Sequence, residues 1–378
     1  MKKILVIAAG FPPAKTYGGP AVSVENFCNL MKDYYELYVI TSNHELHNDA
    51  VLEGIHDGWN DHQSCRVLYL RESFLFYGKL KKIVREIKPD YVYVNSYFSA
   101  HFVLPALSVA KACKIPVVLA PRGQFAKGAL KIKSVKKSVY RLLFNFIKGN
   151  YSLVYQATSK EEYAQIKEKA AKKGDAIIEV ANVPTFTGGE KCRERKTKGL
   201  LKAVYIARIH PIKNLKFALY CLKECKERIV FDIYGPIEDN DYWIECQSII
   251  KELPNNVKVT YMGTLPHNEV ADVLSKHDVF LLPTETENFG HSIVEAMLAK
   301  CIPIISNNTP WVNLQEYGCG WALSLDNKET FSNALDSVAA ESEEEFSKRQ
   351  VAIKDYLDSH LNVTELQQQY CSLFSRNL

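Results

Sequence analysis

The chain of 378 residues is 47% hydrophobic and 24% charged, and its formal net charge at pH 7 is +4. This length exceeds what a single hydrophobic core usually organises, so we expect two domains. The composition is that of an ordinary folded protein and excludes disordered and collagen-like chains.

The charge is shared unevenly along the chain. Lys and Arg number 26 against 17 Asp and Glu through Glu190, whereas the remainder holds 21 against 26. No acidic residue occurs between Asp90 and Glu161. This asymmetry predicts an anionic partner for the first half, which is nucleic acid, a membrane surface or a phosphorylated substrate.

The ten cysteines are scattered and form no C-x-x-C pair. The two nearest, Cys221 and Cys225, stand one helical turn apart without a matching His or Cys cluster. We therefore expect no zinc site, and unpaired thiols of this kind are typical of a reducing cytoplasm.

The first predicted element is a buried strand in "KILVIAA". The preceding lysines and the apolar run imitate a signal peptide, but the run is short, β-branched and followed by Phe11-Pro12-Pro13. Such a pattern favours a strand over an export signal. The longest other apolar stretch, Phe102 to Pro121, is interrupted by lysines and prolines. We expect no segment that spans a bilayer.

Strands and helices then alternate along the chain. The predicted strands are "YELYVITS", "RVLYL", "YVYVNS", "PVVLAP" and "SLVYQATS", followed by "KAVYIA", "IVFDIYG", "VKVTYMG", "VFLLP", "IPIISN" and "GWALSL". Apolar strands separated by amphipathic helices are typical of parallel sheets covered on both faces. The polar segment "TFTGGEKCRERKTKG" between the two series indicates a linker, and the chain beyond about Asn327 is predicted to be helical.

The predicted fold class is α/β, with two tandem doubly wound, Rossmann-like domains that face a cleft. We place the first domain at residues 1–188, the second at 200–360, and a final helix at 361–378 that packs back on the first domain. Ligands of open α/β sheets bind beyond the carboxyl ends of the strands. We therefore expect the functional residues in the strand-end loops.

The stretch "TETENFGHSIVEAM", from Thr284 to Met297, follows one such strand and enters an apolar helix. Unpaired N–H groups and the helix dipole favour phosphate at this helix start, and Gly290 permits close approach of a ligand. Glu295 would be costly to leave unpaired among apolar neighbours, so ribose hydroxyls are candidate partners, with Glu287 on a second sugar. The alternative is that Glu287 is a solvated loop residue and Glu295 a structural, salt-bridged one.

The segment "YIARIHPIKNL" places Arg208 and Lys213 around another strand-end loop. Cations at this position would stabilise the negative charge that develops on a diphosphate leaving group. Arg offers a planar fork for two oxygens and Lys a mobile point charge. The alternative is that Lys213 simply opens the following helix, where a cation is poorly placed for the helix dipole.

With these residues assembled, the chain resembles a retaining glycosyltransferase of family four, with the GT-B fold, over essentially its whole length. The family's E-x-F-G…E motif corresponds to Glu287, Phe289, Gly290 and Glu295, and its diphosphate-binding pair to Arg208 and Lys213. The resemblance implies catalytic roles for Arg208, Lys213 and Glu287. It implies that the second domain binds a nucleotide sugar through Gly235, Gly263, Leu265, Asn288, Phe289, Gly290 and Glu295.

In the first, acceptor-binding domain, the segment "FPPAKTYGGPAVSV" is similar to the family's glycine loop, which implies that Gly18 and Gly19 lie near the donor phosphate. Many relatives carry a histidine where this chain has Arg122, which puts a histidine-dependent role in doubt and suggests a phosphate or an acidic sugar. Asn182 stands where relatives have a Pro-Asn-Gly turn. The segments "TPW" and "GCGW" are similar to those of bacterial surface-polysaccharide enzymes.

The resemblance further implies a front-face, oxocarbenium-like route in which the departing phosphate takes the acceptor proton. Glu287 then positions the donor sugar and does not attack it. The implied reaction transfers a hexosyl or hexosaminyl group to a polysaccharide, oligosaccharide or lipid-linked acceptor. We expect no cofactor and no metal, and a UDP-sugar as the donor.

Three other motifs are interpreted structurally. "EDNDYW" mimics a D-x-D metal motif, but helix-starting acids explain Asp239 and Asp241. "HDGWNDH", with His56 and His62, is expected to be a surface loop and not a metal site. "IAAGFPPAKTYGG" lacks the G-x-G-x-x-G spacing of an NAD enzyme.

The stretch "KGALKIKSVKKSVYRLLFNFIKGN" predicts a basic amphipathic helix. Its apolar stripe is Ile132, Val135, Val139, Leu142 and Phe146, and its basic residues are Lys131, Lys133, Lys136, Lys137 and Arg141. Such a helix can lie on an anionic bilayer, although an ordinary domain helix with a solvated face is the alternative. We predict a cytoplasmic protein peripherally associated with the inner face of the plasma membrane, which suits a lipid-linked acceptor.

Two other functions remain open at this point. One is a catalytically silent GT-B protein that binds a nucleotide sugar or a partner transferase, which intact Glu287, Arg208 and Lys213 disfavour. The other is nucleic-acid binding by the basic half. The chain lacks a recognisable recognition module, so we expect no nucleic-acid partner.

Overall fold

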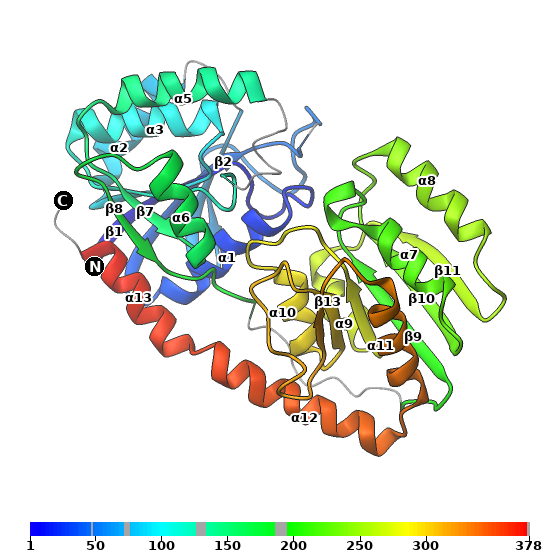
Figure 1. Ribbon diagram of the computed structural model, residues 1–378. Coiled ribbons are helices and arrows are strands. Elements are labelled where there is room, and N and C mark those ends of the chain that lie inside the picture. The colour runs from blue at the N-terminus through cyan, green and yellow to red at the C-terminus, as the bar shows by residue number, and fades with distance from the viewer. Residues whose placement is uncertain (47, 72–75, 126–133, 186–194, 376–378) are drawn as a thin grey trace. The chain divides into compact units, whose positions relative to one another are not determined.

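The computed structural model describes residues 1–46, 48–71, 76–125, 134–185 and 195–375 (Figure 1). The chain folds as two compact units, of which the first joins Met1–Val183 to Val363–Leu378 and the second is Pro184–Asn362. Each unit is built around one sheet with helices packed on it. The α/β class with two Rossmann-like halves is confirmed.

The first unit contains an eight-stranded sheet in the order β3-β4-β2-β1-β5-β6-β7-β8. The described pairings are parallel, apart from the antiparallel pair of β3 and β4. The strands are β1 (Lys2–Ala8), β2 (Tyr35–Ser42), β3 (Trp59–His62), β4 (Cys65–Leu70), β5 (Tyr91–Asn95), β6 (Val117–Ala120), β7 (Val154–Ala157) and β8 (Ala176–Glu179).

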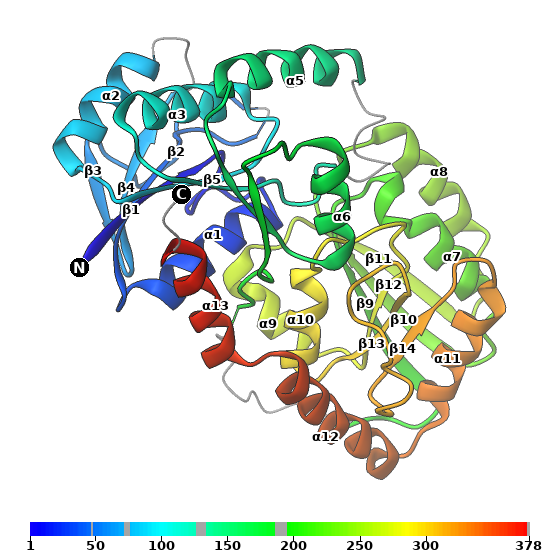
Figure 2. The ribbon, with the colours of Figure 1, turned by 60° about the vertical axis from the view of Figure 1, so that its left-hand side comes forward.

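Helices cover both faces of this sheet (Figure 2). They are α1 (Gly19–Met31), α2 (Phe76–Ile87), α3 (Ala100–Cys113), α5 (Ser134–Lys148), α6 (Lys160–Lys169) and α13 (Val363–Ser375). Leu5 and Ile7 of β1 enter the core beneath α2, α3 and α5, whereas Ile4 and Val6 enter the core with α1 and α13. Because both faces are buried, this strand is continuously apolar in the sequence.

The final helix, α13, belongs to the first unit although it follows the whole second unit in the chain. The hydroxyl of Tyr370 donates to the carbonyl oxygen of Ala181 at 3.0 Å and accepts from Nε2 of Gln156 at 3.0 Å. The ring of Phe374 lies edge-on to that of Tyr93, with centroids 5.5 Å apart. These buried contacts anchor the helix to the sheet.

The second unit contains a six-stranded parallel sheet in the order β11-β10-β9-β12-β13-β14. Its strands are β9 (Leu200–Ile206), β10 (Arg228–Tyr234), β11 (Val257–Gly263), β12 (Val279–Leu282), β13 (Ile302–Ser306) and β14 (Trp321–Leu323). Its helices are η1 (Pro211–Lys213), α7 (Leu215–Lys223), α8 (Asn240–Lys251), η2 (His267–Glu269), α9 (Val270–Leu274), α10 (His291–Leu298), α11 (Lys328–Ala340) and α12 (Glu343–His360).

Most predicted elements are confirmed, including the amino-terminal strand and the helical segment beyond Asn327. The prediction that "HDGWNDH" is only a surface loop was wrong, since Trp59–His62 forms the edge strand β3. Its register with β4 runs from Trp59 opposite Leu68 to His62 opposite Cys65. A short, polar edge strand has no period-2 apolar pattern to mark it, because its hydrogen bonds come from the partner strand.

The strand β8 was also missed, because only four residues pair with β7 at the far edge of the sheet. Among the described residues, no helix has both the length and the apolar content to cross a bilayer. The predicted limit at residue 188 and the last three residues of the predicted final helix lie outside the described residues.

Candidate functional site

The loop after β9 carries Arg208 and is braced by the loop after β10. The amide of Ala207 donates to the carbonyl oxygen of Tyr234 at 3.1 Å. Gly235 has φ of 142°, and a Cβ there would lie 1.9 Å from the carbonyl oxygen of Ala207. The two loops can therefore approach this closely only because residue 235 is glycine.

Arg208 forms an ion pair with both carboxylate oxygens of Glu238. Its Nη1 lies 2.8 and 2.6 Å from the two carboxylate oxygens, and the Arg208 side chain is 45% exposed. The guanidinium is thus held in place by one carboxylate while much of it stays accessible. An exposed ion pair of this kind contributes little to folding stability. Its position therefore says more about function than its energy does.

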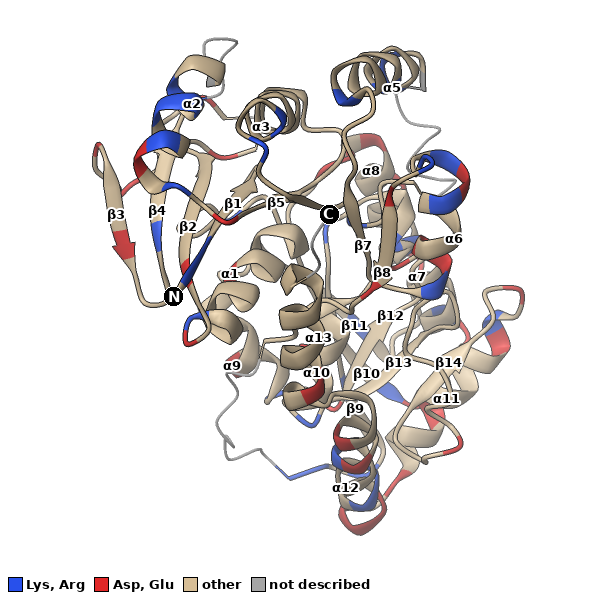
Figure 3. Ribbon diagram, turned by 90° about the vertical axis from the view of Figure 1, so that its left-hand side faces the viewer, with Lys and Arg blue, Asp and Glu red and all other residues tan. Residues whose placement is uncertain are grey.

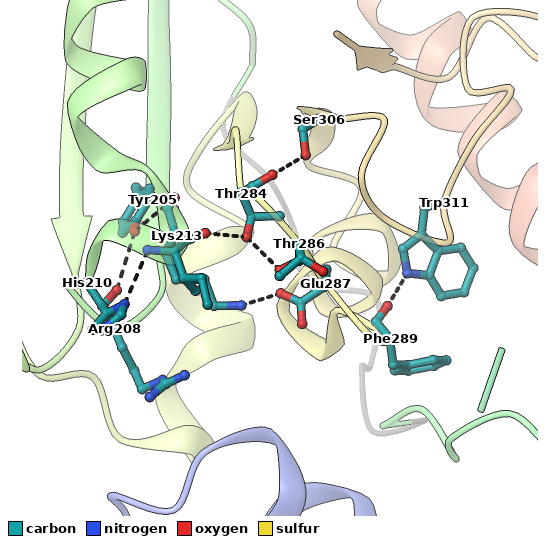
Figure 4. Close-up of polar contacts among 11 residues, drawn as sticks. Tyr205, Arg208, His210, Lys213, Thr284, Thr286, Glu287, Phe289, Ser306 and Trp311 are labelled. Carbon is teal, nitrogen blue, oxygen red and sulfur yellow. Dashed lines mark hydrogen bonds and ion pairs between the residues drawn. The ribbon is translucent and has the colours of Figure 1, made fainter. Parts of the chain in front are cut away.

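Lys213 forms an ion pair with Glu287 across two strand-end loops (Figure 4). The Lys213 side chain is 14% exposed and that of Glu287 is 16% exposed. Lys213 ends the short helix η1, which the His210 side chain caps by accepting from the Ile212 amide. Glu287 is therefore not the solvated loop residue of the alternative interpretation.

The loop between β12 and α10 is fixed to the loop after β9 by Thr284. The Thr284 hydroxyl lies 3.0 Å from the carbonyl oxygens of both Ile212 and Thr286, and the Ser306 hydroxyl donates to the Thr284 carbonyl at 2.5 Å. Thr284 and Ser306 are both fully buried. These bonds keep Glu287 opposite Lys213.

The start of α10 is shaped by an aromatic pair and a glycine. The indole Nε1 of Trp311 donates to the carbonyl oxygen of Phe289 at 2.5 Å, and the two rings lie 5.5 Å apart in an edge-on arrangement. Gly290 occupies the N-cap in the left-handed region, with φ of 78°, and a Cβ there would lie 2.7 Å from Cδ1 of Ile293. Asn288, partly buried, lies in this loop.

Glu295 lies in the second turn of α10, and its carboxylate has few hydrogen-bond donors within reach. Its side chain is 13% exposed, and the hydroxyl of Thr185 lies 3.4 Å from Oε1, which is long for such a bond. Nδ1 of His267 is 3.9 Å away. Burial raises the pKa of Glu295 to about 7, and the bond from Thr185 lowers it only in part. Such a carboxylate is suited to accept further hydroxyl donors.

Two other predicted residues of this unit lie at the end of β11. Gly263 has φ of 83° and its carbonyl oxygen accepts from the amide of Gly235 at 2.9 Å. Leu265 is partly buried against the core of the second unit. The sheet therefore gathers Gly235 and Gly263 at neighbouring strand ends, as expected for parallel strands.

The remaining predicted residues belong to the first unit. Gly18 and Gly19 lead into α1, with Gly18 at φ of 62°. The guanidinium of Arg122 donates to the hydroxyl of Tyr93 at 2.8 Å and to Oδ1 of Asn95 at 3.0 Å. Asn182 is 4% exposed and follows β8. The roles of these four residues stay predictions.

The sequence reasoning missed the residues that hold the site together. Glu238 was interpreted only as part of an acidic helix start, although the acidic run "IEDND" was the available signal for a partner of Arg208. Thr284, Ser306 and His210 carried no motif that would have marked them. Asp239 does cap α8, because its side chain accepts from the amide of Tyr242 at 3.0 Å.

Residues 190–355 match the family described as "Glycosyl transferases group 1". This part of the chain is thus similar to glycosyl transferases group 1. A curated relative is the phosphatidylinositol N-acetylglucosaminyltransferase GPI3 subunit of Saccharomyces cerevisiae, strain RM11-1a, which is 32% identical over 113 residues. That match covers 29% of this chain, and the chain spans about a quarter, 24%, of that relative's length.

Two solved structures share the architecture of the whole chain. One is Anabaena Alr3699/HepE in complex with UDP and glucose, 14% identical, with a TM-score of 0.70 over 99% of this chain and 100% of that one. The other is WaaG, a glycosyltransferase involved in lipopolysaccharide biosynthesis, 10% identical, with a TM-score of 0.67 over 99% of this chain and 100% of that one. The fold is GT-B.

Proposed function

We propose that this protein is a retaining glycosyltransferase of family four that transfers a sugar from a nucleoside diphosphate to a glycan or lipid-linked acceptor. The observation that carries the proposal is the Lys213–Glu287 ion pair, which joins two strand-end loops. The exposed Arg208 lies five residues before Lys213 in the chain. The similarity to glycosyl transferases group 1 and a relative solved with UDP and glucose support this direction.

In this proposal Arg208 and Lys213 bind the diphosphate and stabilise its charge as the glycosidic bond breaks. The diphosphate competes with Glu238 for the Arg208 guanidinium, whose side chain is 45% exposed. Two fixed cations supply positive charge at the leaving group, so we propose that no metal ion is required. Asp239, the first acid of the D-x-D-like motif, already caps a helix.

The two glutamates would then hold hydroxyl groups on either side of the diphosphate. Glu287 keeps one oxygen on Lys213 and offers the other to the donor sugar, whereas Glu295 accepts from the ribose diol. In the front-face route, the departing phosphate takes the acceptor proton. Neither glutamate has to act as a nucleophile.

The experiment that tests this proposal measures both binding and transfer. Thermal shifts with UDP, GDP, ADP, dTDP and their sugars should give the largest rise in Tm with a UDP-sugar, and Lys213→Ala should lose that rise. The anomeric configuration of the product, followed by NMR, should match that of the donor. Binding without transfer or hydrolysis of any donor would instead favour the catalytically silent protein, and an inverted product would exclude the retaining route.

A second element of the proposal is docking on an anionic membrane surface through α5. The stripe along this helix faces solvent, with exposed fractions of 76% for Val135, 61% for Val139, 72% for Leu142 and 84% for Phe146. Tyr140 and Phe144 on the opposite side are buried. An outward apolar stripe on a helix anchored from behind can enter the headgroup region of a bilayer.

Basic residues accompany this stripe. α3 packs against both α2 and α5 in the first unit, and Lys79, Lys82 and Arg85 of α2 are exposed. Figure 3 shows Lys and Arg positions in blue along α2. Not every predicted cation faces out, because Arg141 donates to the Lys169 carbonyl oxygen at 2.6 Å. The predicted Lys131, Ile132 and Lys133 lie outside the described residues.

Flotation with vesicles containing phosphatidylserine tests the membrane element. The triple variant Val139→Ser, Leu142→Ser, Phe146→Ser should stay unbound, whereas Val351→Ser, which removes an equally exposed apolar side chain from α12, should float like the wild type. Unchanged flotation of the triple variant would remove α5 from the proposal and leave the transferase proposal intact.

A further inference from the structure

Two cysteines, a histidine and a glutamate meet in the first unit, and none of them is assigned to the transferase. The β3–β4 hairpin places His62 directly opposite Cys65, separated by a two-residue turn. Glu25 and Cys28 stand three residues apart on α1, so they share one helical face. That face meets the hairpin, because Nε2 of His62 lies 3.5 Å from Oε1 of Glu25.

The two thiols are in contact with each other. Cys28 is fully buried and Cys65 is 8% exposed, and both belong to the core beside α1. The Cys28 thiol hydrogen-bonds to the Cys65 sulfur. No disulfide joins them, and both are free cysteines. A disulfide between them would join the two sulfur atoms at ~2 Å.

Cys65 is also reachable from solvent. It lines a pocket of about 430 Å³ together with His62, Ser64, Arg66 and Lys32. Glu36 and Asp61 also line this pocket, so the charges of its Lys and Arg residues are balanced. Cys28, in contrast, is fully buried and is not among the residues that line this pocket.

The electrostatics of the cluster support a reactive thiol. The hydrogen bond from Cys28 and the neighbouring His62 imidazole hold the pKa of Cys65 below its ordinary value. In turn, Cys65 and Glu25 raise the pKa of His62 to about 9, so the imidazole is protonated near neutral pH. Burial raises the pKa of Cys28. These directions favour the thiolate form of Cys65 and the neutral thiol form of Cys28.

We propose that Cys65 is a site of oxidative modification by hydroperoxides, and that Cys28 is its resolving thiol. The Cys65 thiolate attacks one peroxide oxygen of hydrogen peroxide, the O–O bond breaks, and hydroxide leaves, giving a sulfenic acid on Cys65. The Cys28 sulfur then attacks the Cys65 sulfur and displaces the oxygen as water, which carries away the Cys28 proton. Overall, two thiols lose two electrons to one peroxide and two waters form.

A metal site is the competing interpretation of such a cluster. Within the residues that the structure describes, no group of three or more His, Cys, Asp or Glu side chains is arranged to hold a metal ion. Thiol chemistry needs only the contacts that are present. The proposal does not depend on the transferase activity, since none of these four residues is assigned to it.

The test uses the full chain carrying Cys192→Ser, because residue 192 is not among the described residues. One equivalent of hydrogen peroxide, followed by blocking with N-ethylmaleimide, digestion and mass spectrometry, should give a Cys28–Cys65 crosslink. With Cys28→Ser, dimedone should instead label Cys65, and with Cys65→Ser neither product should form. Cys113 and Cys371 are internal controls, since both are more exposed than Cys65 but lack the histidine.

A second measurement tests whether the reactivity of the Cys65 thiol comes from the charge of His62 or only from exposure to solvent. His62→Gln keeps a hydrogen-bonding side chain but removes the positive charge, so the rate of iodoacetamide labelling of Cys65 at pH 7 should fall about tenfold per unit of restored pKa. Labelling of Cys113 should not change. Faster oxidation of Cys113 or Cys371 than of Cys65, or a Cys65 rate unaffected by His62→Gln, would overturn the proposal.

Discussion

Two buried glutamates, one in each unit, show how differently the same side chain can be used. Glu162 in α6 is 1% exposed and accepts from the amide of Gly123 at 2.5 Å and from the amide of Thr158 at 2.8 Å. The Thr158 hydroxyl also donates to it, at 2.5 Å. The side chain of Glu295 in α10 is 13% exposed, and within the described residues its hydrogen bond is the long one from Thr185.

The contrast separates a structural carboxylate from one suited to a ligand. The carboxylate of Glu162 accepts hydrogen bonds from donors of the protein itself, so it joins a loop to a helix. It has little hydrogen-bonding capacity left for a substrate. Burial of the Glu295 carboxylate costs free energy that hydrogen bonds do not offset as they do for Glu162. The raised pKa of Glu295 reflects this cost. A carboxylate with unmet hydrogen-bonding capacity is a candidate site for a polyhydroxylated ligand.

The largest expected effect concerns Arg208 and Lys213, the two cations of the loop region after β9. Arg208→Ala or Lys213→Ala should each lower turnover by roughly 10²–10³-fold, because a stabiliser of developing charge is lost. Lys216→Ala is the matched control, since Lys216 forms a similar ion pair with Glu245 at 2.5 Å on the neighbouring helix. Steady-state kinetics measure all three variants, and equal losses in Lys213→Ala and Lys216→Ala would refute the assignment.

The next effect tests Glu162. Glu162→Gln should lower the free energy of unfolding by about 1–3 kcal/mol, because an amide group replaces an acceptor oxygen among buried donors. Urea denaturation measures this value. A stability equal to that of the wild type would mean that the satisfied carboxylate is not structural, and the comparison with Glu295 would fail.

The smallest effect is a pH dependence at Glu295. In the folded state this group keeps its proton up to about pH 7, whereas the ordinary value of 4.5 applies on unfolding. Folding stability contributed by the group is therefore present below pH 4.5 and lost as the pH rises to about 7. Glu295→Gln removes this loss, so its gain in Tm over the wild type should be larger at pH 8 than at pH 5.

The sign of that difference is the informative quantity. Thermal scans at both pH values give it, and Glu287→Gln serves as a control at a carboxylate already paired with a cation. A gain that is equal at pH 5 and pH 8 would show that Glu295 does not ionise in this range.

The sequence alone determined the two α/β units and most of their strands. A continuous apolar run such as that of β1 indicates a strand that is buried on both faces. Such a run can be recognised from the residues of the strand alone. The same holds for the loop of Glu287 and Gly290, because its residues are contiguous and follow a recognisable strand. A site whose residues all lie in one short segment can therefore be predicted from the sequence.

Only the tertiary structure decided which residues face each other. The pairing of Lys213 with Glu287 spans 74 positions, and that of Arg208 with Glu238 spans 30. The contact of His62 with Glu25 likewise depends on the short, polar strand β3, whose pairing with β4 has no signal in its own residues. Hydrogen bonds and charges act through space over a few ångströms, so the fold, and not the order of residues, selects their partners.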